Sequence, residues 1–525
     1  MADPAPHRAA SGPQLSPPVV AVVAGFGLVA VVVRFVTSSP FWLDEALSVE
    51  IARLPLGAIG GALRHDGHPP LYYWLLHGWM ALAGDGDTAV RALSGIAGAA
   101  ALPLAWLAGR RVAGRDGAWA ALLLVGVSPY AVRYSTEARM YALVMVLVLA
   151  GHVLVRRAVD DRQASRVTLA GVAAITGALV LTHYWALVLG ASTVLVLAWW
   201  ARRSGPGAAR RTAVHLIAAM AIGAVAFVPW VPSFLHQAAH TATPWAAAAR
   251  PTVVVNETLR DFGGGGSGTE HAEASLLEAG LVVLIALGLF GRTVERRVEL
   301  DLATAPGVRG EATVAALTIA LGSAVGLLTA STFASRYAAV VFPLVALVAA
   351  RGLAVLPPRA PRAVAAAAVV VLAAAGIVGN VRDQRTQAGD LAAAIAAEAR
   401  SGDVVVVCPD QLGPALRRAL DTEGAAAIEL LAYPALDDGR RVDWVDYAER
   451  NDAADPVAVA AQILERVPAS ATVWLAADGT YRTFEGDCEA LGGALGASRP
   501  GRQLVVDDAE RFFEHAGLVA FGPTE

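Results

Sequence analysis

Long apolar stretches separated by short polar loops make up the chain as far as about residue 380. A helix needs about 20 consecutive, mostly apolar residues to cross the hydrocarbon core of a bilayer. The pattern therefore predicts a transmembrane domain at residues 19–380, preceded by a polar, Pro-rich tail at residues 1–18 that we expect to be disordered in the cytoplasm. About eleven transmembrane helices are predicted, at residues 19–36, 87–109, 117–132, 138–155, 167–182, 184–200, 212–232, 276–291, 311–330, 337–356 and 363–380.

Arginine residues distinguish the two sides of this predicted membrane domain. Short cytoplasmic loops of membrane proteins carry an excess of Lys and Arg, so the side that holds the arginines is predicted to face the cytoplasm. The N-terminus shares that side, and an odd number of spans places the C-terminus outside the cytoplasm. The arginines fall in every second loop, at Arg110, Arg111, Arg115, Arg156, Arg157, Arg162, Arg166, Arg202, Arg203, Arg210, Arg211, Arg292, Arg296, Arg297, Arg351, Arg359 and Arg362.

The first external loop, about residues 37–86, is long for a link between two spans. It contains LDEALSVEIARLPLGAIGGALRH, whose apolar residues recur at mixed spacings of three and four, as in one or two short amphipathic helices at the membrane surface. The next segment, HDGHPPLYYWLLHGWM, has a Pro pair that can open a helix and aromatic residues that suit the membrane interface. We therefore expect external juxtamembrane helices before the second span.

The pattern changes at about residue 381, where charge rises and amphipathic segments replace the long apolar runs. Four short apolar runs predict buried strands, and helical patterns lie between them, so residues 381–525 are expected to form a small extracytoplasmic α/β domain with a largely parallel sheet. Cys408 and Cys488 both lie here, where a disulfide can persist, although two buried thiols are the alternative. The four runs are DVVVVCPD, AAIELLAY, ATVWLAAD and RQLVVDD.

Composition agrees with a membrane protein. The 525 residues are 56% hydrophobic and 16% charged, whereas a soluble domain carries about 25% charged residues. The chain has no lysine and is rich in Ala, Gly, Val and Arg, as a GC-rich genome would encode, and we expect a bacterial plasma membrane protein. A net charge of −4 and the lack of a G-x-G-x-x-G turn or a Walker loop give no support for nucleic acid or nucleotide partners.

Charged and aromatic residues outside the cytoplasmic loops fall into five short stretches: WLDEA, HDGHPPLYYW, SPYAVRYSTEARMYAL, THYW and STFASRYAAVVFPL. One topology places all five on the external side, which predicts a site at the outer membrane interface. Arginine is unexpected on the external side, because the other arginines of the membrane domain lie on the cytoplasmic side. Binding of an anionic group would explain its presence there. The candidate residues are Asp44, Glu45, His65, His68, Tyr72, Arg133, Tyr134, Glu137, Arg139, His183, Tyr184, Arg336 and Tyr337.

Each of these residues also has a structural explanation that needs no catalytic or binding role. Asp44 could cap a helix, with Glu45 favourable in the first helical turn. The arginines could extend along the interface or pair with Glu137. The histidines could be interfacial hydrogen-bonding groups, and Tyr72 could belong to an aromatic belt.

Taken in order, the motifs resemble those of the GT-C glycosyltransferases. They are Asp-Glu in the first external loop, H-x-PP-L-Y-Y-W after it, Y-S-x-E-A-R-x-Y, H-Y, and R-Y-x(5)-P late in the bundle. The protein mannosyltransferases and the aminoarabinose transferases are the members most similar to this chain. The resemblance covers about residues 19–380, and many members carry an extracytoplasmic domain after it. One departure is His68, which stands where aminoarabinose transferase relatives have a lysine.

The resemblance implies transfer of a sugar from a polyprenyl-phosphate carrier in the membrane to a glycan, lipid or protein acceptor outside the cytoplasm, with inversion. Of the two candidate catalytic carboxylates, Asp44 would be the general base and Glu45 would have the smaller effect on turnover. Arg139 and Arg336 would hold the donor phosphate, with His68 and Arg133 as weaker candidates.

A divalent metal on Asp44, Glu45, Asp66 and Glu137 is conceivable in this superfamily, but we favour a mechanism without a metal. Adjacent carboxylates on a helix point in different directions and are poorly placed to share one ion. The alternative function is a lipid or glycan transporter or flippase. Such a protein needs polar residues along a path through the bilayer, whereas here they gather at one face.

Overall fold

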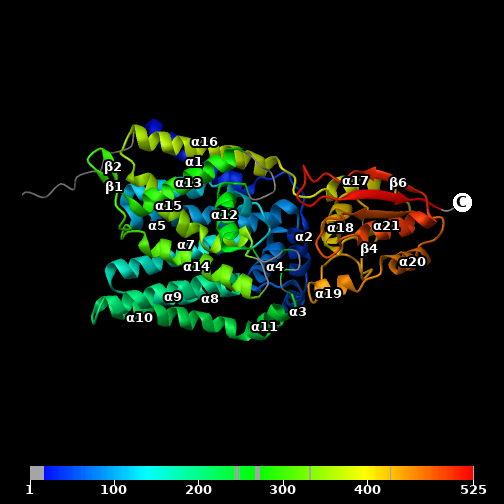
Figure 1. Cartoon of the computed structure of the whole chain (residues 1–525), viewed down its shortest axis with the longest axis horizontal. Helices are drawn as coiled ribbons and strands as arrows, with labels where there is room; N and C mark the ends of the chain where they lie inside the picture. Colours follow the sequence, from blue (N-terminus) through cyan, green and yellow to red (C-terminus); the bar gives the residue numbers. More distant parts are fainter. Residues whose placement is uncertain are drawn as a thin grey trace, which may run out of the picture.

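The computed structural model describes residues 17–523 except 242, 244–245, 247–248, 266–271, 330–332 and 426, and nearly all of the predicted tail at 1–18 lies outside these residues. Figure 1 shows a helical part followed along the long axis by a smaller α/β part that contains the C-terminus. The helical part ends with α16 (Ala360–Arg382), close to the predicted boundary at residue 380. The division into domains at 1–18, 19–380 and 381–525 stays a prediction.

Among the described residues, seven helical segments are long and apolar enough to cross a membrane. A polytopic helical membrane protein is therefore confirmed, while eleven crossings stay a prediction. Three shorter apolar helices accompany the seven: Ala24–Phe35, Arg166–Thr182 (α8) and Phe342–Val355 (α15). The seven are Asp87–Val127 (α5), Tyr141–Asp161 (α7), Trp185–Arg203 (α9), Ala208–His240, Ala272–Phe290 (α13), Arg309–Leu328 (α14) and Ala360–Arg382.

Helix α5 contains two of the predicted spans. Its backbone leaves the helical conformation at Ala113 and Gly114, and Gly114 adopts a positive φ of 63°. The two halves then run back against each other, because a Cβ added at Gly109 would lie 2.3 Å from the carbonyl oxygen of Gly117. The kink explains why one 41-residue helix stands where the sequence predicts spans at 87–109 and 117–132.

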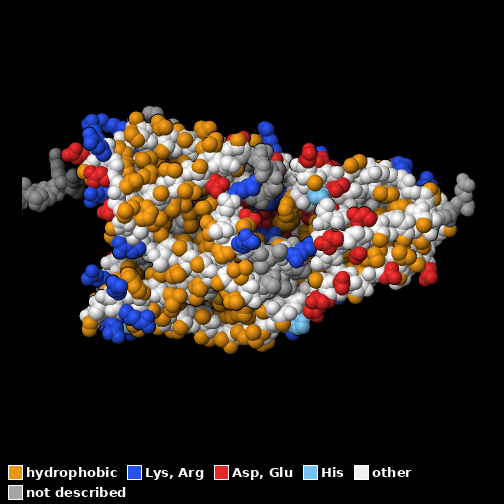
Figure 2. Space-filling model, viewed as in Figure 1, with side chains coloured by type: hydrophobic (Ala, Val, Ile, Leu, Met, Phe, Trp, Pro, Cys, Tyr) orange, Lys and Arg blue, Asp and Glu red, His pale blue; other side chains and the backbone are white. Residues whose placement is uncertain are grey.

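Charge is distributed unevenly along the long axis. Figure 2 shows basic side chains at the end of the helical part that lies away from the C-terminal domain, and a broad apolar surface between the two ends. That is the arrangement of a multi-pass membrane protein with one basic face. The assignment of the basic face to the cytoplasm stays a prediction.

Short helices cover the other end of the membrane part, as the first external loop predicts. They are α2 (Leu43–Ala52), α3 (Leu56–Asp66) and α4 (Leu71–Ala83). Pro55 and Pro70 precede α3 and α4, and Gly67 ends α3 with a positive φ of 90°. Helix α2 does not lie on the surface, because most of its residues are buried and Leu43 belongs to the core of the C-terminal domain.

The remaining elements connect the spans. Between α5 and α7 lies α6 (Pro129–Ser135), and η3 (Ser335–Val340) precedes α15. The segment Ala208–His240 comprises α10 (Ala208–Ala224), η2 (Val225–Trp230) and α11 (Val231–His240), and α12 (Pro251–Phe262) follows it. A hairpin of β1 (Gly291–Val294) and β2 (Arg297–Leu300), which the pattern does not predict, occupies a basic loop. The first span is α1 (Pro17–Val32) with η1 (Val33–Phe35).

The C-terminal domain is built on one five-stranded sheet with strand order β4-β3-β5-β7-β6. The prediction of a largely parallel sheet is only half correct, since β4, β3 and β5 are parallel, whereas β7 and β6 are antiparallel to their neighbours. A disulfide joins Cys408 and Cys488. The strands are β3 (Val404–Cys408), β4 (Glu429–Ala432), β5 (Val473–Ala477), β6 (Gly501–Val505) and β7 (Gly517–Phe521).

Alternate residues of β3 enter two separate apolar clusters, one on each face of the sheet. Both faces are therefore covered, as expected for strands that read as continuous apolar runs. The helices of the domain are α17 (Ala388–Glu398), η4 (Asp410–Leu412), α18 (Gly413–Thr422), α19 (Tyr447–Asp452), α20 (Pro456–Arg466) and α21 (Asp487–Ser498).

The tight packing of α13 on α15 provides a stability test. A Cβ at Gly288 would lie 2.0 Å from the carbonyl oxygen of Val348, whereas a Cβ at Gly280 of the same helix meets nothing within 4 Å. Gly288→Ala should therefore destabilise the protein by about 1–3 kcal/mol through overpacking. Gly280→Ala is the matched control and should leave the thermal unfolding temperature in detergent close to the wild-type value. Equal unfolding temperatures for the two variants would contradict this packing.

Candidate active site

A hollow between the membrane helices and the C-terminal domain contains acidic and basic side chains, in contrast to the apolar surface beside it (Figure 2). The charged groups come from α2, from the α3–α4 and α6–α7 links and from η3. These segments are separated by long stretches of sequence, and the folding of the bundle brings their ends together. The site is therefore an assembly of helix ends.

Asp44 lies between two arginines. Its Oδ2 is 3.5 Å from Nη1 of Arg336 and 3.8 Å from Nε of Arg139. Its side chain is 14% exposed, so the carboxylate can be reached from outside. Asp44 does not cap α2, because that helix begins one residue earlier, at Leu43.

Arg139 is held by several neighbours in addition to Asp44. Its Nη1 donates to Oγ of Ser48 at 3.1 Å and to the hydroxyl of Tyr73 at 3.3 Å. Burial favours the neutral form of Arg139, but the carboxylate of Asp44 prevails, and the pKa of Arg139 is raised well above its usual value. A fixed positive charge therefore lies beside Asp44.

His68 positions Arg139. Nε2 of His68 is 2.9 Å from Nη2 of Arg139, and Nδ1 is 2.8 Å from Oδ2 of Asp66. Arginine can only donate, so Nε2 accepts and the proton of the neutral ring is on Nδ1, which donates to Asp66. The hydroxyl of Tyr73 donates to the same carboxylate oxygen at 2.9 Å. His68 thus links Arg139 to a buried acid and has no free donor nitrogen to offer a phosphate.

Glu45 is fully buried and occupied. Nε and Nη2 of Arg91 donate to its two oxygens at 2.7 and 2.5 Å, and the backbone N–H of Ala138 donates to Oε1 at 2.9 Å. Burial raises the pKa of Glu45, but Arg91, Arg385 and the Ala138 N–H lower it by more, so the net pKa is below the usual value. Glu45 therefore fixes α2 to α5 and to the α6–α7 link.

Two further acidic residues, Asp261 and Glu137, contact groups in or next to α6. The hydroxyl of Tyr134 donates to Oδ2 of Asp261 at 3.3 Å. Glu137 is buried, and its Oε2 is 3.7 Å from Nη1 of Arg385. Burial raises the pKa of Glu137, and Arg385 and Arg133 offset only part of that effect. These groups lie around the candidate base without a direct bond to it.

His183 and Tyr337 form an aromatic wall beside the arginines. The ring of His183 is 5.3 Å from the ring of Tyr337 and 5.9 Å from that of Tyr141, and Arg336 lies 5.6 Å above Tyr337. Burial, with a smaller effect of nearby His68 and arginines, lowers the pKa of His183 to about 3. His183 is therefore neutral at physiological pH.

Three predicted residues lie apart from this cluster. His65 is exposed, and its Nδ1 is 2.9 Å from Oδ1 of Asp443 in the C-terminal domain. Tyr72 is buried, with its hydroxyl 3.4 Å from Oγ of Ser94, so it is not part of an exposed aromatic belt. Tyr184 hydrogen-bonds to Gln237 and accepts from Nε1 of Trp230 at 2.9 Å. A contact of these three with a substrate stays a prediction.

Sequence reasoning missed Arg91 and Arg385, both of which surround Glu45. The signal that singles out Arg139, an arginine away from the cytoplasmic loops, applies equally to these two. It also missed Glu514 of the C-terminal domain, which accepts from the backbone N–H of Leu43 at 2.6 Å and from Oγ1 of Thr386 at 3.0 Å. Glu514 thus supplies the acceptor at the N-terminus of α2.

The four carboxylates considered for a metal are each occupied by a protein partner. Asp44 is paired with Arg139 and Arg336, and Glu45 with Arg91. The other two, Asp66 and Glu137, face His68 and Arg385. Guanidinium groups, which cannot ligate a cation, occupy the space between the carboxylates. The donor set therefore fits an anionic ligand better than a divalent ion.

Residues 67–232 match the protein family described as dolichyl-phosphate-mannose-protein mannosyltransferase. Over these residues, which make up about a third of the chain, the protein is similar to a family of membrane glycosyltransferases. The resemblance drawn from the sequence motifs is thereby confirmed. The matched segment includes the α3–α4, α6–α7 and α8–α9 links, which carry much of this glycosyltransferase's candidate site.

The fold of the glycosyltransferase is similar to that of solved structures. ArnT from Cupriavidus metallidurans in the apo state has a TM-score of 0.64 at 14% identity, covering 97% of this chain and 100% of that chain. The same protein bound to undecaprenyl phosphate gives 0.58 at 14% identity, covering 97% and 99%. The Archaeoglobus fulgidus oligosaccharyltransferase gives 0.50 at 12% identity, covering 92% and 72%. No curated protein matches the chain at a significant level.

Glu514 provides a pH test of the junction between the two parts. Burial raises the pKa of Glu514 to about 8, although hydrogen bonds from Leu43 and Thr386 oppose the shift. Between its ordinary value near 4.5 and about 8, the folded state binds more protons than the unfolded state. The stability of the glycosyltransferase should therefore fall as pH rises through this range.

Glu514→Gln should make the unfolding temperature less dependent on pH between 5 and 8, as measured by thermal unfolding in detergent. Exposed Glu465 offers a matched control, and Glu465→Gln should keep the wild-type profile. Parallel profiles for Glu514→Gln and wild type would contradict a role for Glu514 in this dependence.

Proposed function

We propose that this glycosyltransferase moves a sugar from a polyprenyl-phosphate carrier to an acceptor outside the cytoplasm, with Asp44 as the general base and inversion at the anomeric carbon. The observation that carries the proposal is the position of Asp44, a partly exposed carboxylate paired with buried Arg139 and with partly exposed Arg336. This reaction needs a base beside positive charge for the phosphate, and the pairing of Asp44 with Arg139 and Arg336 supports that arrangement.

In the proposed reaction, one oxygen of Asp44 accepts the proton of the acceptor hydroxyl or amine. The freed electron pair attacks the anomeric carbon while the bond from that carbon to the phosphate oxygen breaks. The carrier phosphate leaves with the bonding pair and needs positive charge more than a proton, which Arg139 and Arg336 supply. The polyprenyl monophosphate is then released to the membrane.

In this proposal, Asp44 pairs with the two arginines when no donor is bound. A donor phosphate would compete with the Asp44 carboxylate for the guanidinium groups, because both are anions with similar geometry. Donor binding would thus release Asp44 toward the acceptor. An arginine that hydrogen bonds already hold in place needs little reorganisation during the reaction. Ser48, Tyr73 and His68 hold Arg139 in this way.

Glu45 has a different role in this proposal. Its oxygens are occupied by Arg91 and by the Ala138 N–H, so it positions the helix that carries Asp44 and does not contact the substrate. Arg133, Glu137, His183 and Tyr337 line or support the remainder of the site. Their contacts with donor or acceptor are part of the proposal.

The acceptor class, a glycan, lipid or protein of the cell envelope, follows from the external position proposed for the site. We propose a bacterial plasma membrane location with the N-terminus in the cytoplasm and the C-terminal domain outside. The transporter alternative has less support, because the charged groups meet at one end of the bundle.

Asp44→Asn tests the proposal directly. The change keeps the size of the side chain but removes the base, so transfer should fall by about 10²–10⁴-fold. Donor binding should persist or tighten, because the carboxylate that competes for Arg139 and Arg336 loses its charge. Both quantities can be measured with a radiolabelled polyprenyl-phosphate sugar, with membranes of a strain lacking the protein as the source of acceptor.

Asp85→Asn is the control, because Asp85 is exposed and pairs with Arg53 at the surface. Glu45→Gln should lower the amount of folded protein more than the turnover of the folded fraction. If Asp44→Asn keeps normal turnover while folded Glu45→Gln loses it, the base has been assigned to the wrong carboxylate.

A further inference from the structure

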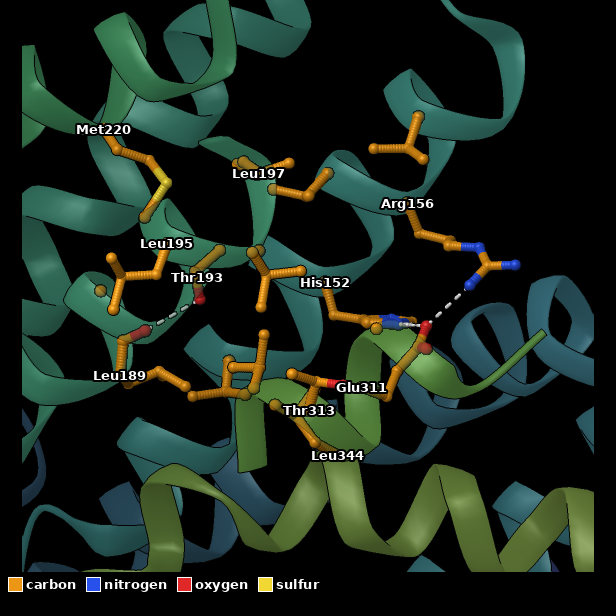
Figure 3. A pocket seen from close by; sticks show the side chains of 18 of the residues that line it. His152, Arg156, Leu189, Thr193, Leu195, Leu197, Met220, Glu311, Thr313 and Leu344 are labelled. Carbon is orange, nitrogen blue, oxygen red and sulfur yellow. Dashed lines mark hydrogen bonds and ion pairs between the residues drawn. The ribbon is translucent and has the colours of Figure 1, made fainter. Parts of the chain in front are cut away.

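A cavity lies within the membrane part, and its lining includes Arg156, Arg162 and Arg309 beside the basic loops. Figure 3 shows part of this lining. The volume of the cavity is about 960 Å³, within the range of ligand sites. Residues of α7, α8, α9, α10 and α14 line it, and most of them are apolar. Helix α7 connects the two regions, since Tyr141 lies beside the candidate active site and His152 lies in the cavity.

One end of the cavity is polar. Oε1 of Glu311 is 2.9 Å from Nε2 of His152 and accepts from Nη1 of Arg156 at 2.9 Å, as Figure 3 shows. Both the Glu311 and the His152 side chains are more than nine-tenths buried. Oε2 of Glu311 and Nδ1 of His152 have no hydrogen-bond partner among the described residues. Buried polar atoms without partners are rare and costly, so these two atoms fit a ligand that brings a donor.

The mouth of the cavity on the basic face is rich in arginine. Arg156, Arg162 and Arg309 line it, with Asp160 as the acidic residue among them. Each of these arginines adjoins a loop that the sequence assigns to the cytoplasm. The positive charge at this mouth complements a phosphate group.

The apolar part of the cavity extends over more than half the thickness of the hydrocarbon core. Its lining follows α9 from Ala186 to Trp200, fourteen rises of 1.5 Å per residue, or about 21 Å. The hydrocarbon core of a bilayer is about 30 Å thick. Leu195 and Trp199 of the same lining are 53% and 51% exposed, so the cavity opens sideways toward lipid.

We propose that this cavity binds an anionic glycerophospholipid from the cytoplasmic leaflet. Its phosphate lies at Arg156, Arg162 and Arg309, a hydroxyl of its headgroup donates to Oε2 of Glu311, and its acyl chains fill the apolar part. A polyprenyl carrier fits less well, because its tail is far longer than the apolar part of the cavity. The bound lipid joins α7, α9 and α14, two of which begin at the outer site.

Native mass spectrometry of the full chain in detergent, titrated with phosphatidylglycerol, tests the proposal. One phospholipid per chain should bind, and phosphatidylcholine, which lacks both the net charge and the hydroxyl donors, should bind about tenfold more weakly. Gly190 lines the cavity, and a Cβ there meets nothing within 4 Å, so Gly190→Leu should fill the space and reduce binding at least tenfold. Arg309→Gln should weaken phosphatidylglycerol binding severalfold and phosphatidylcholine binding less.

Gly280→Leu is the matched control, since Gly280 is equally open but does not line the cavity. Thermal unfolding shows whether each variant is folded. Donor turnover should be unchanged in folded Gly190→Leu, and this result distinguishes a failure of the lipid proposal from a failure of the proposal for Asp44. Unchanged phosphatidylglycerol binding in folded Gly190→Leu would overturn the proposal. Stronger binding of polyprenyl phosphate than of phosphatidylglycerol would also overturn the proposal, if that binding is lost in Gly190→Leu. Such a loss would show that the polyprenyl phosphate binds in the cavity.

Discussion

The buried ion pair between Glu45 and Arg91 determines where the candidate base lies. Arg91 donates two hydrogen bonds to Glu45 from the N-terminal end of α5, and the Ala138 N–H adds a third from the α6–α7 link. Removing either charge would take away the main partner of the other buried charge, which is costly inside a protein. Helix α2 is thereby held in one rotation about its axis.

That rotation separates the two neighbouring carboxylates. Successive residues on a helix point about 100° apart, so when Glu45 faces Arg91, Asp44 faces another direction. In this structure that direction is toward Arg139 and Arg336. Glu514 supports the same helix from the C-terminal domain by accepting the Leu43 N–H. The C-terminal domain is therefore part of the framework that positions Asp44.

A structural feature can be predicted from the sequence when neighbouring residues determine it, and not when distant contacts do. Apolar helices coincide with the predicted spans because apolar length is a local property, and the Pro pair marks the start of α4 at Leu71. The fold of α5 into a hairpin depends on close contact of Gly109 with Gly117, which hydropathy does not reveal. Strand β7 is short and pairs antiparallel to β5, whereas alternating strands and helices suggest parallel neighbours.

The candidate site shows the same limit. Motifs located Asp44, His68, Arg139 and Arg336, since each stands out against its surroundings in the sequence. They could not show which carboxylate is buried, because Glu45 meets Arg91 46 positions away and Leu43 meets Glu514 471 positions away. Partners at such separations are set by the packing of the whole bundle.

A structure of the glycosyltransferase with a polyprenyl monophosphate bound would test the central claim most directly. We expect phosphate density in contact with the guanidinium groups of Arg139 and Arg336. The Asp44 carboxylate should have moved off both, while Glu45 remains bound to Arg91. Phosphate density elsewhere, with Asp44 still paired with the two arginines, would contradict the assignment of base and phosphate site.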